Sequence, residues 1–349
     1  MKILVIQMKM IGDVLTSSIL FEALRKEFPK AELHYLINAH TFPVVQNNPN
    51  IDRFVLYNKE QSFSKLAKKM KAENYNVVID VLSNIKTAIL TGLSGATYRI
   101  SYDKFYTKPV STHVFSRKIE PKTVGGSAIE KRLRMLTPLS ANFPAEIKPK
   151  IFLQEDEIIN AKQKLEEAGI DISRNLYMIG ALGSSEKKTY PLKYLAKLLD
   201  QIVEETNAHL LFNYIPNQKT QVEKLFGFCS SATQKNIHLD IYGNSLREFL
   251  AITYHCDALI GNEGGAINMA KAMEVPTFAI FAPPLHKENW NMYEDGKKNI
   301  SVHLRDFKPD MFVDKPEKQL KTEWENFYNE FHPGMIEEKL GKFLNMNSK

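Results

Sequence analysis

Segments with strand character alternate with segments of helical character along this chain, and the alternation runs through twice. The first series predicts strands at residues 2–6, 32–37, 51–56 and 75–80, with helices between and after them at 13–28, 62–72 and 84–93. The second series predicts strands at residues 176–181, 209–214, 258–261 and 277–281. Strands separated by helices need right-handed crossovers, which produce parallel sheets covered on both faces. The sequence therefore predicts an α/β protein with two doubly wound, Rossmann-like domains.

A chain of 349 residues is long enough for two domains of ordinary size. We expect one domain over residues 1–150, a second over 151–321, and terminal helices over 322–349. In open parallel sheets, ligands bind beyond the carboxyl ends of the strands. Two such domains in succession favour an arrangement in which both sets of strand ends face a shared cleft.

The turn after the first strand separates this chain from two large classes of nucleotide-binding proteins. It contains Gly12 alone, whereas dinucleotide-binding domains carry three glycines at fixed spacing there, and the P-loop pattern is absent from the chain. The longest apolar runs, such as residues 278–282, are far shorter than a membrane span, and the N-terminus lacks the features of a signal peptide. These features predict a cytoplasmic protein.

Neither a metal ion nor a bound cofactor is expected. The two cysteines, Cys229 and Cys256, have no second Cys or His at metal-ligand spacing, and such residues are usually small apolar members of a core. No Asp-x-Asp pair occurs, although that pair is the commonest carboxylate arrangement for holding a divalent metal on a nucleotide diphosphate. Lysines and helix dipoles would then have to neutralise a diphosphate.

The net charge of +6 is concentrated in one stretch of the chain. Residues 99–134 contain nine basic residues and three acidic ones, a surplus equal to the charge of the whole protein. A concentrated basic stretch favours an anionic partner, such as a phosphorylated sugar, a lipid surface or a nucleic acid. The alternative is a solvated basic face without a partner. A nucleic-acid partner is disfavoured because no aromatic stacking residues are interleaved in a recognised module.

Asp13 stands where the first strand meets the first helix, in the sequence Ile-Gly-Asp-Val-Leu-Thr that begins at residue 11. Gly12 allows a tight turn there, and the carboxylate falls at the helix N-terminus on the ligand-binding edge of the sheet. Two interpretations remain open. Asp13 is either a helix N-cap or a general base that removes a proton from an acceptor hydroxyl.

Gly264 and Gly265 follow an apolar strand of the second domain and precede a helix of small residues. Free backbone N–H groups at such a helix start suit a diphosphate, particularly where no Cβ obstructs the approach. A tight turn needed only for packing is the alternative.

Two lysines occupy further strand-to-helix junctions. Lys188 lies in the stretch 183–191 of the second domain, where its charge would offset the charge that develops on a departing diphosphate. Lys86 lies at the start of the helix expected at 84–93, where it would bind an anionic acceptor together with Arg99 and Arg132 of the basic stretch. Each lysine, taken alone, also fits an ordinary solvated surface position.

Together these junctions resemble glycosyltransferase family 9, the heptosyltransferases of lipopolysaccharide core assembly. The resemblance covers most of the chain and rests on the residues around Asp13, the Phe-Pro-Lys-Ala run from residue 28, and the Asn-Pro-Asn-Ile-Asp run from residue 48. It also rests on Leu-Ser-Gly-Ala from residue 93 with Arg99 and Ile100, on Lys-Thr-Tyr-Pro from residue 188, and on residues 261–270 followed by Val275 and Pro276.

The resemblance implies a GT-B fold, with an acceptor domain first, a donor domain second, and last helices that return toward the first domain. Asp13 would be the catalytic base of an inverting, metal-independent transfer of heptose from ADP-heptose to a lipopolysaccharide core or similar surface glycan. The donor would be bound by Lys188, Ser184, Glu263, Gly264, Gly265 and Asn268. The acceptor would be an anionic glycolipid, and the basic surplus of residues 99–134 predicts peripheral contact of the protein with the inner face of the membrane.

The chain departs from the family pattern around the donor. Members usually carry Asp-Thr-Gly followed by a His three residues on, whereas this chain has Glu263, Gly264 and Gly265 followed by Asn268. Serines that are common before the Gly-Asp pair are replaced by Lys9 and Met10. Two alternatives therefore remain: a GT-B transferase that uses another nucleotide sugar, and a catalytically silent paralogue that binds one.

Overall fold

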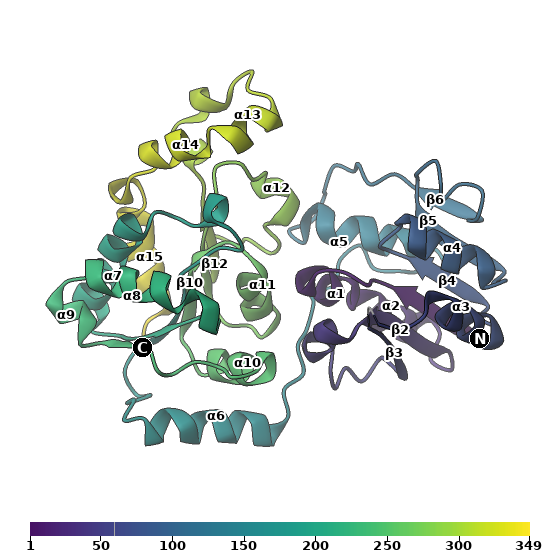
Figure 1. Ribbon diagram of the computed structural model, residues 1–349, viewed down its shortest axis with the longest axis horizontal. Coiled ribbons are helices and arrows are strands. Elements are labelled where there is room, and N and C mark those ends of the chain that lie inside the picture. The colour runs from purple at the N-terminus through teal and green to yellow at the C-terminus, as the bar shows by residue number, and fades with distance from the viewer. Residues whose placement is uncertain (59) are drawn as a thin grey trace. The chain divides into compact units, whose positions relative to one another are not determined.

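The computed structural model describes residues 1–58 and 60–349, which form two compact units over residues 1–152 and 153–349 (Figure 1). The predicted boundary at residue 150 lies close to this division.

The first unit contains a six-stranded parallel sheet in the order β3-β2-β1-β4-β5-β6. Its strands are β1 (Lys2–Ile6), β2 (Glu32–Asn38), β3 (Arg53–Tyr57), β4 (Val77–Asp80), β5 (Tyr98–Tyr102) and β6 (His113–Phe115). The helices are α1 (Ile11–Ser17), α2 (Ile19–Glu27), α3 (Phe63–Ala72), α4 (Ile85–Leu93) and α5 (Gly126–Leu133). Helices α3 and α4 contact each other, while α1, α2 and α5 form a second contacting group. The sheet is therefore doubly wound, as predicted.

The second unit repeats this topology, with a six-stranded parallel sheet in the order β12-β11-β10-β7-β8-β9. Its strands are β7 (Leu176–Gly180), β8 (His209–Phe212), β9 (Ile237–His238), β10 (Ala258–Asn262), β11 (Thr277–Ile280) and β12 (Asn299–Val302). Its helices are α6 (Glu155–Glu167), α7 (Leu192–Thr206), α8 (Lys219–Phe228), α9 (Ser231–Gln234), α10 (Leu246–Tyr254), α11 (Gly265–Ala272), α12 (Lys287–Trp290), α13 (Glu317–Thr322), α14 (Trp324–Glu330) and α15 (Glu337–Asn347). Both sheets therefore reverse strand order beside their first strand, where ligands bind in such folds.

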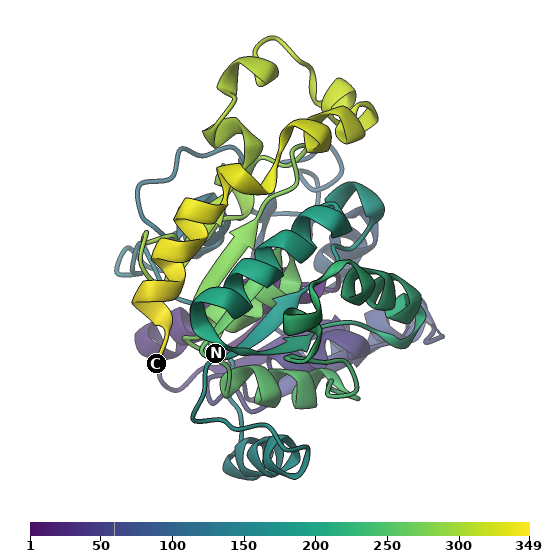
Figure 2. The ribbon, with the colours of Figure 1, turned by 90° about the vertical axis from the view of Figure 1, so that its left-hand side faces the viewer.

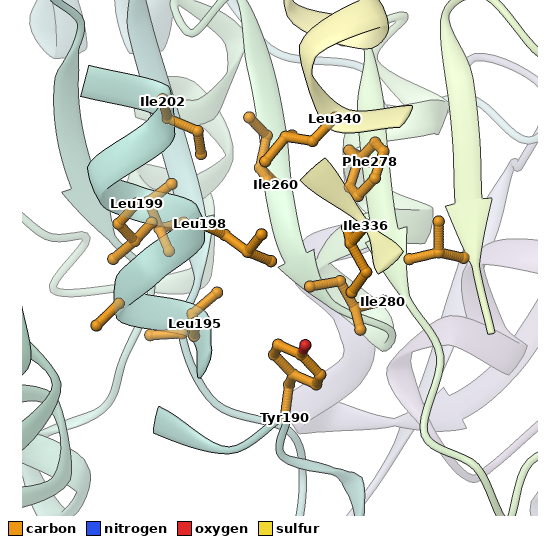
Figure 3. Packing of buried hydrophobic residues seen from close by; sticks show 14 of the residues in the cluster. Tyr190, Leu195, Leu198, Leu199, Ile202, Ile260, Phe278, Ile280, Ile336 and Leu340 are labelled. Atoms are coloured by element: carbon orange, nitrogen blue, oxygen red, sulfur yellow. The ribbon is translucent and has the colours of Figure 1, made fainter. Parts of the chain in front are cut away.

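The core of the second unit explains why its strands have continuous apolar sequences. In β7 the side chains of Tyr177 and Ile179 enter one large cluster, and the intervening Met178 is buried as well. Alternate residues of a strand point to opposite faces, so a strand buried on both faces needs apolar residues throughout. Figure 3 shows this cluster, with side chains of α7 packed against those of β10, β11 and α15.

The terminal residues are grouped with the second unit. Phe343 of α15 lies against Phe278 of β11, with ring centroids 5.5 Å apart, and α15 also contacts α7 (Figure 2). Apolar residues of α15, including Leu340 and Leu344, are fully buried there. Helix α15 is therefore part of the second core, and the return of residues 322–349 toward the first domain stays a prediction.

Other differences concern short elements. The helix predicted over 13–28 is divided at Ser18 into α1 and α2, and the Ser18 hydroxyl donates to the Leu15 carbonyl at 2.7 Å. Strands β5, β6, β9 and β12 were not predicted, because each is short and several carry polar or charged residues that interrupt an apolar pattern. Within the described residues, no helix is both long and apolar enough to cross a membrane.

Candidate active site

Asp13 lies in the first turn of α1, just beyond the carboxyl end of β1. The N-cap residue is Met10, and no side chain caps the helix, so Asp13 is not the N-cap that the sequence left open. Met10 has φ 59°, a left-handed conformation that is strained for a side chain of this kind. The sequence predicted that Gly12 makes the tight turn, but the left-handed residue of this turn is Met10. A Cβ built on Gly12 would meet no heavy atom within 4 Å, and the Asp13 side chain itself is 27% exposed.

A buried arginine fixes the orientation of the Asp13 carboxylate. Arg132 of α5 is 5% exposed and donates through Nη2 to Asp13 Oδ1 at 2.7 Å. Its Nε donates to the Ser17 hydroxyl at 2.9 Å, and its Nη1 donates to the Ala128 carbonyl at 2.6 Å. The sequence placed Arg132 among the residues that bind an acceptor. The structure instead commits three of its nitrogen atoms to neighbouring protein groups, including Asp13.

A second cationic side chain, that of Lys131, interacts electrostatically with this carboxylate. Burial and the neighbouring Arg132 and Arg117 lower the pKa of Lys131 to about 8. The Arg117 guanidinium lies over the Tyr102 ring, 4.6 Å from its centroid, and donates to the Leu82 carbonyl at 2.9 Å. The Tyr102 hydroxyl is buried and has no hydrogen-bond partner among the described residues. The sequence indicated this basic stretch as a whole but did not single out Lys131, Arg117 or Tyr102.

Arg99 and Lys86 have different environments from each other. Arg99 lies near the amino end of β5, away from the edge at which Asp80 ends β4. Its Nε donates to the Val110 carbonyl at 2.7 Å and its Nη1 donates to the Ala96 carbonyl at 2.6 Å. Arg99 therefore holds a loop together, which argues against the predicted contact with an acceptor. Lys86 is exposed in the first turn of α4, at the same sheet edge as Asp80.

In the second unit, a buried asparagine organises the corresponding sheet edge. Asn262 at the end of β10 donates from Nδ2 to the carbonyls of Gly180 and Ala181, both at 2.9 Å, and accepts from the Tyr190 backbone N–H at 2.6 Å. It thereby joins β10 to both ends of the loop that carries Lys188. No role was predicted for Asn262, although its position as a polar residue at the end of an apolar strand could have indicated one.

The glycines at this edge fall into two kinds. A Cβ on Gly183 would lie 2.1 Å from the Lys188 carbonyl oxygen, and one on Gly261, whose φ is +137°, would lie 2.4 Å from that of Gly180. These two glycines are needed for close packing. Cβ atoms on Gly264 and Gly265 would meet nothing within 4 Å, and φ at Gly264 is extended. The packing alternative therefore does not explain Gly264 and Gly265.

Glu263 directly precedes Gly264 and Gly265 and interacts electrostatically with Lys188. Burial raises the pKa of Glu263, while Lys188 and Lys271 act in the opposite direction. Lys188 is half buried. Its effect on the pKa of Glu263 shows that these two predicted donor residues lie within electrostatic range of each other. Tyr328 of α14, whose pKa burial and Glu263 both raise, was not predicted to be near. Asn268 is partly exposed on α11, and Ser184 is exposed in the loop.

The comparisons identify the family. The sequence profile of glycosyltransferase family 9 (heptosyltransferase) matches residues 63–320 of this chain. The chain belongs to this family. This family 9 chain is 24% identical over 316 residues to lipopolysaccharide heptosyltransferase 1 of Campylobacter coli. The aligned region covers 86% of this chain and 91% of that protein. The predicted family and glycosyltransferase class are thus confirmed.

Solved family 9 structures confirm the GT-B fold. The crystal structure of the family 9 glycosyltransferase from Veillonella parvula DSM 2008 has a TM-score of 0.72 at 19% identity, and covers 94% of this chain and 97% of that one. An E. coli heptosyltransferase solved with ADP-2-deoxy-2-fluoro heptose has a TM-score of 0.64 at 12% identity, and covers 95% of this chain and 100% of that one.

Two further features bear on the chemistry of this glycosyltransferase. The described residues include no group of three or more His, Cys, Asp or Glu side chains that would hold a metal ion. Cys229 and Cys256 are buried, and burial raises the pKa of Cys229 to about 12. Both thiols are therefore poor nucleophiles at neutral pH, in agreement with their expected place in the core.

Proposed function

We propose that this glycosyltransferase transfers a heptose from ADP-heptose to a lipopolysaccharide core or similar surface glycan, with Asp13 as the general base. The observation that carries the proposal is the 2.7 Å ion pair between Asp13 and the buried Arg132. The ion pair engages Oδ1 of a carboxylate that caps no helix and whose side chain is 27% exposed. A general base needs a fixed direction and room for its substrate, and Asp13 has both.

In the proposed step, Asp13 Oδ2 takes the proton from an acceptor hydroxyl as its oxygen attacks the anomeric carbon of the donor sugar. The bond from that carbon to the diphosphate breaks, and ADP leaves with the electron pair. One base acting on the face opposite the leaving group inverts the anomeric centre. Arg132 keeps the carboxylate oriented throughout, as a positioning residue.

The donor half of the proposal rests on the second unit. The N-terminal N–H groups of α11 have no partner within the helix, and the open positions at Gly264 and Gly265 let a diphosphate approach them. Lys188 supplies positive charge to the departing ADP, and Glu263 contacts hydroxyl groups of the donor, with Ser184 and Asn268 as further polar contacts. The E. coli relative solved with an ADP-heptose analogue supports this choice of donor.

The acceptor half rests on cations around Asp13. Lys131 interacts electrostatically with both Asp13 and Arg117, and the two cations would bind an anionic group of the acceptor. Lys86, exposed at the same sheet edge, extends this positive surface. We propose that the enzyme acts in the cytoplasm on an anionic glycolipid, and the name of the C. coli relative, a lipopolysaccharide heptosyltransferase, supports a glycolipid acceptor.

The proposed reaction needs no metal, because helix α11 and Lys188 offset the diphosphate charge.

The test is a transfer assay with ADP-heptose, GDP-heptose and UDP-glucose on truncated lipopolysaccharide, with ADP release and the glycan product both measured. We expect product with ADP-heptose, unchanged rates in EDTA, and an inverted anomeric configuration by NMR. Nucleotide binding without turnover on any acceptor, unaffected by Asp13→Asn, would instead support a silent binding protein.

A further inference from the structure

The outer faces of two neighbouring helices in the first unit differ sharply. In α4 the exposed residues are Ile85 (59%), Ile89 (44%), Leu93 (50%) and Lys86. The three apolar residues are spaced by four, so they form one stripe along the helix. The inner face is complete without them, since Thr87, Ala88, Leu90 and Thr91 are buried against the unit. A stripe of large apolar side chains on the outside of a helix indicates a contact with something else.

Helix α3 lies beside α4 and has the opposite character (Figure 1). Its buried face carries Leu66, Ala67 and Met70, while Lys65, Lys68, Lys69 and Lys71 are exposed. Neither helix contains an acidic residue. The pair therefore presents an apolar stripe bordered by uncompensated positive charge.

The segment between β5 and β6 lies along the C-terminal part of α4. A Cβ built on Gly92 would be 3.1 Å from Val110 Cγ1, so this segment is in contact with the helix. Phe105, in the same segment, is 85% exposed. Its neighbours are anchored, because Lys104 Nζ and the Tyr106 hydroxyl both donate to the Ser83 carbonyl, at 2.6 and 3.1 Å. A fixed backbone thus holds an aromatic ring out in solvent.

We propose that the outer face of α4, with Phe105 and the lysines of α3, binds the surface of an anionic lipid bilayer. An apolar stripe framed by lysines is the pattern by which helices lie in the interfacial region of membranes. Lysines near an anionic surface add about 1 kcal/mol each, whereas in a symmetric pair of copies the same lysines would repel one another. Charge complementarity therefore favours lipid over a second copy of this chain.

This surface refines the expectation of membrane contact, which the sequence assigned to the basic stretch 99–134. Helix α4 begins just after β4 ends, at the edge of the sheet that also carries Asp13. Binding there would hold that edge close to the lipid headgroups. The purpose of the surface rests on the proposed glycolipid acceptor, but the surface itself rests only on the residues described.

The test is flotation of the full chain with vesicles of phosphatidylglycerol and phosphatidylethanolamine, or of phosphatidylcholine alone. We expect binding to the anionic vesicles only, and loss of at least tenfold in the double variant Ile89→Ser, Leu93→Ser. The matched control is Ile159→Ser, which removes an apolar side chain 55% exposed on α6 of the second unit. Circular dichroism checks that each variant is folded.

The charge is tested by Lys65→Gln, Lys68→Gln and Lys69→Gln together, which should weaken binding to anionic vesicles by roughly a hundredfold. The control is Lys197→Gln, an exposed lysine on α7. Equal flotation of all variants, or a wild-type dimer in sedimentation velocity that Ile89→Ser dissociates, would overturn the proposal.

Transfer to a deacylated, water-soluble acceptor separates this proposal from the proposed function. The α4 variants should retain it, and lose activity only on acceptor embedded in vesicles. If wild-type protein floats yet transfers to neither acceptor, the proposed function fails and the lipid surface stands.

Discussion

Asp13 and Glu263 are both carboxylates that follow a strand at the carboxyl edge of a parallel sheet, but their surroundings differ. Asp13 is held at 2.7 Å by a buried guanidinium that two further protein groups keep in place. No described side chain is hydrogen-bonded to the Glu263 carboxylate, and burial raises its pKa. A carboxylate that must accept a proton along one direction needs a fixed hydrogen-bond donor to orient it. A carboxylate that binds a ligand keeps its hydrogen-bonding capacity for that ligand.

The largest expected effect is that of Asp13→Asn. We expect kcat to fall by roughly a thousandfold, because general-base catalysis contributes on the order of 10²–10⁴. Affinity for ADP, measured by calorimetry, should not change. Asp103→Asn, an exposed carboxyl in the same unit, is the control. Loss of ADP affinity with unchanged kcat would mean that Asp13 binds the donor and is not the base.

Arg132→Lys tests whether Arg132 acts by orienting the Asp13 carboxylate. Lysine keeps the charge but cannot reach Asp13, Ser17 and the Ala128 carbonyl together, so we expect kcat to fall about ten- to a hundredfold, with the KM for the donor unchanged. Arg134→Lys, whose guanidinium donates to the Ser116 carbonyl, is the control. A raised KM for the acceptor with normal kcat would instead show that Arg132 binds the acceptor, which is the role predicted from the sequence.

Gly265→Ala tests whether the space in the second unit is for a ligand. A methyl group there meets no protein atom but would occupy the space proposed for the diphosphate, so we expect about tenfold weaker ADP binding without loss of stability. Gly261→Ala should do the reverse and destabilise the fold, because its Cβ would lie 2.4 Å from the Gly180 carbonyl oxygen. Thermal unfolding and calorimetry on both variants distinguish the two outcomes.

The smallest effect is the pH dependence of ADP binding through Glu263. Its pKa is raised above 4.5, so the ionised form that repels a diphosphate becomes populated only as pH rises through that higher pKa. We expect Glu263→Gln to bind ADP several-fold more tightly than wild type at pH 8, and equally near pH 4.5. The titration of ADP itself cancels in this ratio. Weaker binding by Glu263→Gln at pH 8 would show that the ionised form holds the nucleotide.

Much of the site was predictable because parallel sheets bind ligands at one edge. The positions of Asp13, Lys188, Gly264 and Gly265 at strand-to-helix junctions follow from apolar runs and turn residues that lie close together in sequence. The charge of Arg99 is visible in the sequence, whereas its place near the amino end of β5 and its bonds to the Val110 and Ala96 carbonyls are not. Asn262 was missed for the complementary reason, since its three bonds reach residues more than 70 positions away.

The sequence by itself determined the two doubly wound sheets, because strand and helix periodicity are local properties of the chain. It also determined the family, through short motifs at the sheet edges. Only the tertiary structure decided that Arg132 holds Asp13 across 119 positions, that the last helices complete the second core, and which glycines border open space. Those outcomes depend on which distant side chains compete for the same volume and the same hydrogen bonds, and local patterns carry no record of that competition.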